Sequence, residues 1–196
     1  MIGEAIPGYC YGSTLGEMRQ DDNGMMDGLQ LDGILPEELE SFLAFSARAE
    51  GTNINPQTLL ATDYLNHFNE IIMMLEMIPD MAECYEEAQA WAPKDYQAHF
   101  HDSQFRDREL AVEAYDHVPA KYRKPFEDIL TQMNTLVATA VERIGNTLEP
   151  GREEELKFVC SEASRNLQKL MDFASAVIHG STRVLDQAEI DGFLGR

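Results

Sequence analysis

Residues 125–148 read PFEDILTQMNTLVATAVERIGNTL, and residues 153–179 read EEELKFVCSEASRNLQKLMDFASAVIH. In both stretches an apolar residue recurs every three or four positions, which is the period of an amphipathic α-helix. The first stripe consists of Phe126, Ile129, Leu130, Met133, Val137, Val141 and Ile144, and the second of Leu156, Val159, Ala163, Leu167, Leu170, Ala174 and Val177. The two stripes predict two long helices.

The short connection between these helices predicts how they run. Glu149-Pro150-Gly151 has the composition of a tight turn, so the second helix is expected to return antiparallel to the first. Gly180 is placed to end the second helix. At 1.5 Å per residue the resulting hairpin is ~35 to 40 Å long.

Shorter helices are predicted before this hairpin. Pro36, followed by two glutamates, starts a helix that runs to about Ala49. Asn55-Pro56 opens the next helix, which Pro79 ends or kinks. The middle of the chain predicts three short helices, at residues 80–91, 94–101 and 106–117. No strand pattern competes, so the predicted fold class is all-α, a helical bundle built on a long antiparallel helical hairpin with shorter capping helices.

The predicted domain organisation has three parts. Residues 1–33 hold seven glycines and several aspartates without an apolar period, which is typical of a flexible acidic segment. Residues 34–180 form the helical bundle domain. Residues 181–196 form a C-terminal amphipathic peptide that is suited to docking on another protein.

Composition narrows the possible partners. The chain has 15 Lys and Arg against 35 Asp and Glu, a formal net charge of −20, which repels nucleic acid and anionic membranes. Its longest apolar run, residues 71–75, is far too short to cross a bilayer. Its three cysteines are widely spaced, as in reduced proteins of the cytoplasm. A cytoplasmic protein is therefore expected, with neither nucleic acid nor membrane as a partner.

The C-terminal peptide carries the first functional lead. It reads RVLDQAEIDGFLGR from Arg183, with apolar side chains on one side and acidic ones on the other. Residues 185–194 resemble the docking peptide that the flagellar switch protein FliM and the chemotaxis phosphatase CheZ offer to the response regulator CheY. The resemblance implies a CheY-like receiver protein as the partner. The residues that would bind it are Leu185, Gln187, Glu189, Ile190, Asp191, Phe193 and Leu194.

The second lead is a pair of polar residues in the first long helix. Asp128 and Gln132 are four positions apart, hence on one helical face, and both lie outside the apolar stripe. Their spacing, their place on a hairpin helix and the docking peptide downstream are similar to the CheZ family. The resemblance implies that Gln132 orients a water in line with the phosphorus of an aspartyl phosphate, while Asp128 holds a receiver lysine. The receiver would supply Mg²⁺, so this chain needs no bound cofactor.

Two alternatives of other classes remain. The chain could be a non-catalytic helical adaptor or structural protein whose tail completes its own dimer, and long hairpins often form four-helix homodimers. It could also be a metal-binding bundle, because four histidines fall near acidic residues. These are His67, His99, His101 and His117, with Glu70, Asp102, Glu113 and Asp116. The chain lacks the Glu-x-x-His motif of di-iron bundles, so no metal ligand is predicted.

Aromatic and methionine side chains gather in the middle region. The aromatic residues run from Trp91 to Phe126, and the methionines are Met73, Met74, Met77 and Met81. Filling of the core is the preferred interpretation of both sets, rather than a cofactor pocket.

Overall fold

The structure is a computed structural model that describes residues 25–26, 29–182 and 192. The chain divides into two compact units, Met1–Asp32 and Gly33–Arg196. All helices of two turns or more in the described part belong to the second unit, and the protein is mostly helical, which confirms the predicted all-α class. No helix among the described residues is long and apolar enough to cross a membrane.

The first unit contains an element that the sequence analysis missed. Strands β1 (Met25–Met26) and β2 (Leu29–Gln30) pair antiparallel, with Met25 opposite Gln30 and Met26 opposite Leu29. The sequence between them is Asp-Gly, the dipeptide that two-residue hairpin loops favour. Strands of two residues are too short to show the alternating pattern by which strands are predicted.

Helix α1 (Pro36–Ala49) has the predicted bounds. Proline takes the first helical position, and a Glu38 carboxylate oxygen accepts the Leu35 N–H at 3.2 Å, which satisfies a donor that the helix itself cannot pair. Near the other end of α1, Arg48 forms an ion pair with Glu113 at 2.6 Å. The helix is thereby held against a later part of the same unit.

The segment after α1 differs from its prediction. Helix α2 (Asn66–Met77) begins eleven residues after Asn55, preceded by a short 3₁₀ helix η1 (Thr62–Leu65). Residues 51–61 instead form a loop, because Asn55 closes a turn: its side chain accepts the Gln57 N–H and its carbonyl accepts the Leu59 N–H. Thr58 donates from this loop to the Ile178 carbonyl at 2.7 Å. Burial of the loop therefore outweighs the local signal for a helix.

The middle of the chain forms three short helices, each shorter than predicted. They are α3 (Cys84–Ala90), α4 (Tyr96–Asp102) and α5 (Arg108–Tyr115). Asp95 caps α4 by accepting the Ala98 N–H at 2.7 Å. The Tyr85 side chain of α3 lies so close to Gly145, a residue of a later helix, that a Cβ atom at position 145 would collide with the Tyr85 hydroxyl. The absence of a side chain at this position lets α3 approach closely.

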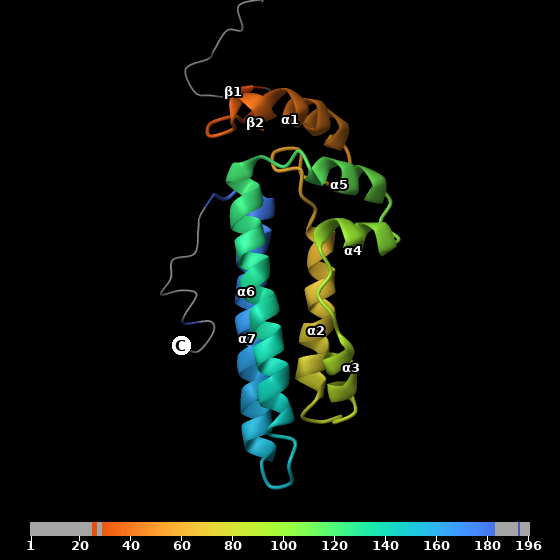
Figure 1. Cartoon of the computed structure of the whole chain (residues 1–196), viewed down its shortest axis with the longest axis vertical. Coiled ribbons are helices and arrows are strands. Elements are labelled where there is room, and N and C mark those ends of the chain that lie inside the picture. Colours follow the sequence, from red (N-terminus) through yellow and green to blue (C-terminus); the bar gives the residue numbers. More distant parts are fainter. Residues whose placement is uncertain (1–24, 27–28, 183–191, 193–196) are drawn as a thin grey trace, which may run out of the picture. The chain divides into compact units, whose positions relative to one another are not determined.

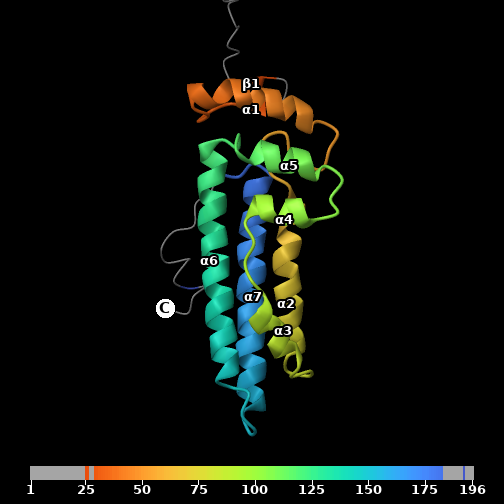
Figure 2. The same cartoon turned by 45° about the vertical axis from the view of Figure 1, so that its right-hand side comes forward.

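Two helices of 26 residues each form the longest elements, α6 (Ala120–Gly145) and α7 (Glu153–Ile178). Figures 1 and 2 show α7 returning beside α6. Helix α6 begins five residues before the predicted Pro125. A Glu38 carboxylate oxygen from α1 accepts the Ala120 N–H at 3.1 Å, and this cap joins residues 82 positions apart, which no local pattern reveals. Gly180, with φ +100°, follows the end of α7 as predicted.

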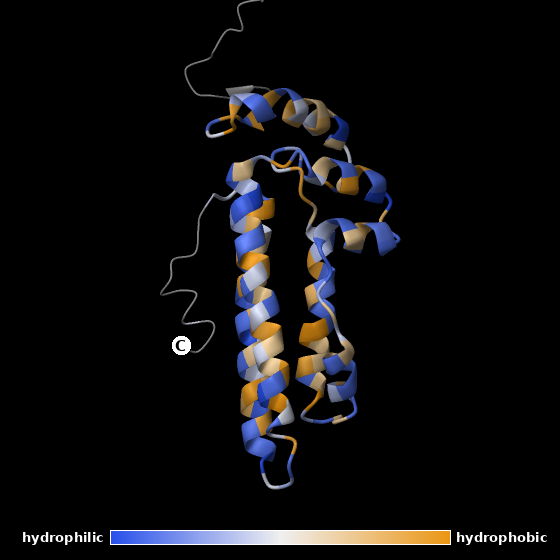
Figure 3. Cartoon of the chain, viewed as in Figure 1, coloured by the Kyte–Doolittle hydropathy of each residue, from blue (hydrophilic) through white to orange (hydrophobic). Residues whose placement is uncertain are grey.

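The core lies where α2 and α6 both pack against α7. The long helices carry both hydrophobic and hydrophilic residues, as Figure 3 shows. The residues of the two predicted stripes are buried except for Val141, which is half-buried. Fully buried aromatic side chains fill the space beside the helices: Tyr64, Phe68, Tyr96, Phe100, Tyr122 and Phe126. The hydroxyl oxygen of Tyr96 accepts a hydrogen bond from the Ala61 N–H at 2.8 Å. Five of the aromatic residues predicted for the core are buried, whereas Trp91 and Phe105 are half-buried.

Three of the four methionines that were predicted to fill the core are exposed instead. Met73, Met77 and Met81 have exposed fractions of 59%, 40% and 41%. The core of α2 is filled instead by Phe68, Ile71 and Leu75. The apolar residues of this helix cover more than one face, and a periodicity argument does not show which of them is left outside.

Candidate functional site

Asp128 and Gln132 lie on one side of α6, as their spacing predicts. Asp128 is exposed and Gln132 is half-buried. Gln132 and Arg143 are eleven residues apart, close to three helical turns, so they point to the same side of α6. Arg143 forms an ion pair with Glu162 of α7 at 3.0 Å. Gln132 therefore lies on the edge of α6 that borders α7.

Both side chains are available to an external group. Within the part of the chain that the structure describes, neither Asp128 nor Gln132 forms a hydrogen bond or an ion pair. The neighbouring threonine hydroxyls are not available in this way. Thr131, Thr135 and Thr139 each donate to the carbonyl four residues earlier, at 2.8 to 2.9 Å. The pair Asp128 and Gln132 thus supplies the free polar groups of this surface.

This surface can position a reaction but holds no nucleophile of its own. A carboxylate accepts hydrogen bonds from a cation, and an amide can both donate to and accept from a water. From Ile129 to Val141 the helix has no charged residue, in a chain that is 26% charged. The carboxylates of α6 that border this stretch are Glu127 and Asp128 on one side and Glu142 on the other.

The predicted docking peptide lies outside the described residues. Its binding residues are Leu185, Gln187, Glu189, Ile190, Asp191, Phe193 and Leu194. Helix α7 ends at Ile178, and the described chain continues to residue 182. The docking role of these residues stays a prediction.

The histidines do not assemble into a metal site. His67 and His99 are neighbours, with ring centroids 6.0 Å apart, whereas His101 lies exposed beside Asp102 and His117 stacks on Phe45. Among the described residues, no group of three or more His, Cys, Asp or Glu side chains could hold a metal ion.

His67 has a structural role in the wall of the core. Its Nε2 atom accepts the Lys94 N–H at 3.1 Å, so the ring proton of the neutral form lies on Nδ1. The imidazole stacks on Trp91 with 4.6 Å between ring centroids. Burial lowers the pKa of His67, opposed by the nearby Glu70 carboxylate, and burial likewise lowers the pKa of His99. These two histidines are held neutral, as packing residues are.

The lowered pKa values of His67 and His99 predict how stability depends on pH. In the unfolded chain both titrate near 6.5, whereas in the folded chain they accept a proton only at lower pH. Well above pH 6.5 both histidines are neutral in the folded and the unfolded chain, so these groups do not change stability there. As the pH falls below 6.5, the unfolded chain takes up protons first and the free energy of unfolding decreases.

Urea unfolding at pH 7.5 and pH 5.5 measures this effect. The His67→Gln variant should lose part of the decrease, while His101→Gln should keep it, because His101 is exposed. An equal decrease in both variants would assign the pH dependence to other groups.

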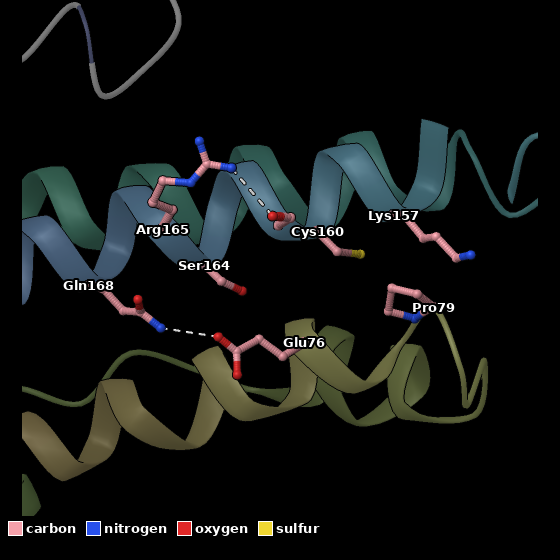
Figure 4. A pocket seen from close by; sticks show the side chains of 8 residues that line it. Glu76, Pro79, Lys157, Cys160, Ser164, Arg165 and Gln168 are labelled. Atoms are coloured by element: carbon pink, nitrogen blue, oxygen red, sulfur yellow. Dashed lines mark hydrogen bonds between the residues drawn. The ribbon is translucent and has the colours of Figure 1, made fainter. Parts of the chain in front are cut away.

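A groove between α2 and α7 was not predicted from sequence. It has a volume of about 350 Å³, and its lining residues are Glu76, Pro79, Lys157, Cys160, Ser161, Ser164, Arg165 and Gln168. Figure 4 shows Gln168 reaching Glu76 across it, where the amide donates to the carboxylate at 3.0 Å. Ser164 points toward α2, and its buried hydroxyl oxygen has no hydrogen-bond partner among the described residues.

The thiol in this groove is not a catalytic nucleophile. Cys160 is 1% exposed, and burial raises the pKa of its thiol to about 11. Because the thiolate is the reactive form, very little of it is present near neutral pH. The groove has two exposed cations, Lys157 and Arg165, but Lys157 lies 3.6 Å from Glu154 and Arg165 contacts Ser161. Its features fit a solvated seam between helices.

No family model, curated protein or solved structure matches this chain. Of the surfaces above, the one at Asp128 and Gln132 combines exposure, free polar groups and a motif with a chemical interpretation.

Proposed function

We propose that this chain is a regulatory protein of two-component or chemotaxis signalling that binds a CheY-like response regulator and accelerates its dephosphorylation. The observation that carries the proposal is the placement of Asp128 and Gln132 on one accessible side of α6, without hydrogen-bond partners among the described residues. The tail at residues 185–194 supplies affinity for the receiver, through its apolar side chains and acidic flank.

The proposed reaction is hydrolysis of the receiver's aspartyl phosphate. The Gln132 amide holds a water so that its oxygen attacks phosphorus opposite the aspartate oxygen that leaves. The new P–O bond forms as the bond to the receiver aspartate breaks, and the products are inorganic phosphate and the free carboxylate. Asp128 holds a receiver lysine, and the receiver supplies the Mg²⁺. The rate gain comes from positioning rather than from covalent chemistry.

The architecture proposed for this function is a helical bundle whose scaffold is the α6–α7 hairpin. Two copies would pair through such hairpins into four helices, as long helical hairpins often do. A receiver works in the cytoplasm, and we propose that location for this chain.

The decay of phosphorylated receivers tests the proposal. Each receiver of the source organism is phosphorylated, and the decay rate is measured alone, with the full chain, and with a chain truncated after Gly180. We expect faster decay with the full chain for one receiver, and loss of most of that gain on truncation. Circular dichroism of the truncated chain checks that its helices are retained.

Three outcomes would contradict the proposal in whole or in part. If no receiver decays faster, the chain is a non-catalytic adaptor or a structural dimer. If truncation leaves the acceleration unchanged at low protein concentration, the tail is not the docking element. Binding without acceleration would leave a receiver-binding protein and remove the phosphatase role.

A further inference from the structure

Three exposed methionines lie along the last turns of α2 and the turn that follows it. Met73, Met77 and Met81 follow one another at intervals of four, and their exposed fractions are 59%, 40% and 41%. Met73 and Met77 belong to α2, and Met81 follows them after a turn in which the Met81 N–H donates to the Met77 carbonyl at 2.9 Å. Residues four apart on a helix are neighbours, at roughly 6 Å between Cβ atoms. We refer to these three side chains as the methionine stripe.

The chain segment that carries the methionine stripe has acidic side chains and no lysine or arginine. From Ala49 to Pro93 the chain contains no lysine and no arginine. The same segment, which includes all of α2 and α3, has eight acidic residues: Glu50, Asp63, Glu70, Glu76, Asp80, Glu83, Glu86 and Glu87. In the part of the chain that the structure describes, the ion pairs involve other carboxylates. The stripe therefore has acidic neighbours in its own segment, while Lys157 and Arg165 of α7 line the groove beside Glu76.

We propose that the methionine stripe is a docking site for a basic amphipathic helix of another protein. Such a helix would lay its apolar side chains on the thioethers, while its lysines and arginines face the acidic residues of α2 and α3. Methionine suits this use because its long, polarisable side chain adapts to different apolar partners. The opposite side of α2, with Ile71 and Leu75, is buried in the core, so docking requires no opening of the fold.

Charge favours a separate partner over the chain's own terminal segments, because both segments are themselves net acidic. Residues 1–24 contain one arginine and four acidic residues, and 1 − 4 gives −3. Residues 183–196 contain two arginines and three acidic residues, and 2 − 3 gives −1. The stripe of a second copy is as acidic as the first, so two stripes would repel each other. A separate basic helix is the complementary partner.

Fluorescence anisotropy with a defined probe tests the docking site. The probe is a labelled peptide of leucine and lysine, about five helical turns long, with all leucines on one face. Its control has the same composition in an order that spreads the leucines around the helix. The variant is Met73→Gln with Met77→Gln and Met81→Gln, which removes the apolar stripe and leaves the charge unchanged. The matched control is Phe158→Gln, because Phe158 of α7 is 61% exposed.

At physiological salt we expect the amphipathic peptide to bind at least tenfold more tightly than its control, about 1.4 kcal/mol. The triple variant should lose this preference, and Phe158→Gln should keep it. Equal binding of the two peptides, no binding, or a preference retained in the triple variant would each overturn the proposal.

Sedimentation of the chain alone tests whether a second copy of the chain covers the methionine stripe. If the chain self-associates and the triple variant does not, a second copy covers the stripe and the proposal is wrong. An equal oligomeric state of both chains supports it. All of these measurements omit the receiver, so their failure and that of the phosphatase proposal can be told apart.

Discussion

Replacing Gln132 with alanine is expected to reduce the accelerated decay of the phosphorylated receiver by at least about 100-fold, while receiver binding is unchanged. Loss of the positioning of an attacking water has effects of this order. The side chain is half-buried at the edge of α6, away from the apolar core, so its truncation should not unfold the helix. Stopped-flow measurement of the decay, with binding followed separately by anisotropy, gives both quantities.

Two further variants give this prediction its controls. Asp128→Asn should weaken the contact to the receiver lysine and lower the rate by a smaller factor. The second variant is Thr139→Ala. Thr139 lies eleven residues from Asp128 on the same side of α6, and its hydroxyl already donates to the Thr135 carbonyl. With this variant, the phosphorylated receiver should therefore decay as fast as with the unmodified chain. Equal rates for Gln132→Ala and the unmodified chain would remove Gln132 from the mechanism.

Replacing Phe126 with alanine is expected to lower the free energy of unfolding by about 3 to 5 kcal/mol. Phe126 is 0% exposed, and its ring meets the rings of Tyr64 and Tyr96 at centroid distances of 5.9 and 6.0 Å. It is the side chain by which α6 reaches the aromatic cluster beside α2 and α4. Its loss leaves a cavity, and the midpoint of thermal unfolding should fall by about 10 °C.

Thermal and urea unfolding followed by circular dichroism measure this loss. Phe126→Leu keeps most of the volume and should cost less than half as much. Phe158→Ala removes an equally large but exposed ring and should change stability by less than about 0.5 kcal/mol. If Phe126→Ala and Phe158→Ala had similar effects, the aromatic cluster would not be the core that the structure describes.

The helices could be predicted from sequence where local signals decide them. Pro36 fixed the start of α1, and Gly180 follows the end of α7 as predicted. The starts of α2 and α6 could not be predicted, because contacts distant in sequence decide them. Thr58 bonds to Ile178, and Glu38 caps α6 at Ala120. A local pattern contains no information on either partner.

The candidate site was predictable only in part, for a similar reason. The spacing of Asp128 and Gln132 places them on one side of a helix, and α6 confirms that shared side. Their accessibility depends on which side of α6 meets α7, and this requires the tertiary structure. The exposed methionines were misplaced because hydrophobicity alone does not distinguish a buried side chain from an exposed one.

The close approach of Tyr85 to Gly145 couples two positions that lie far apart in the sequence. Any larger residue at position 145 needs the ring of Tyr85 to swing off α6, which also breaks the bond from the Gln89 amide to the Tyr85 hydroxyl. Substitution at either position therefore changes what the other can tolerate. The effects of substitutions at the two positions are therefore expected not to add, because whichever residue changes alters the room left for the other.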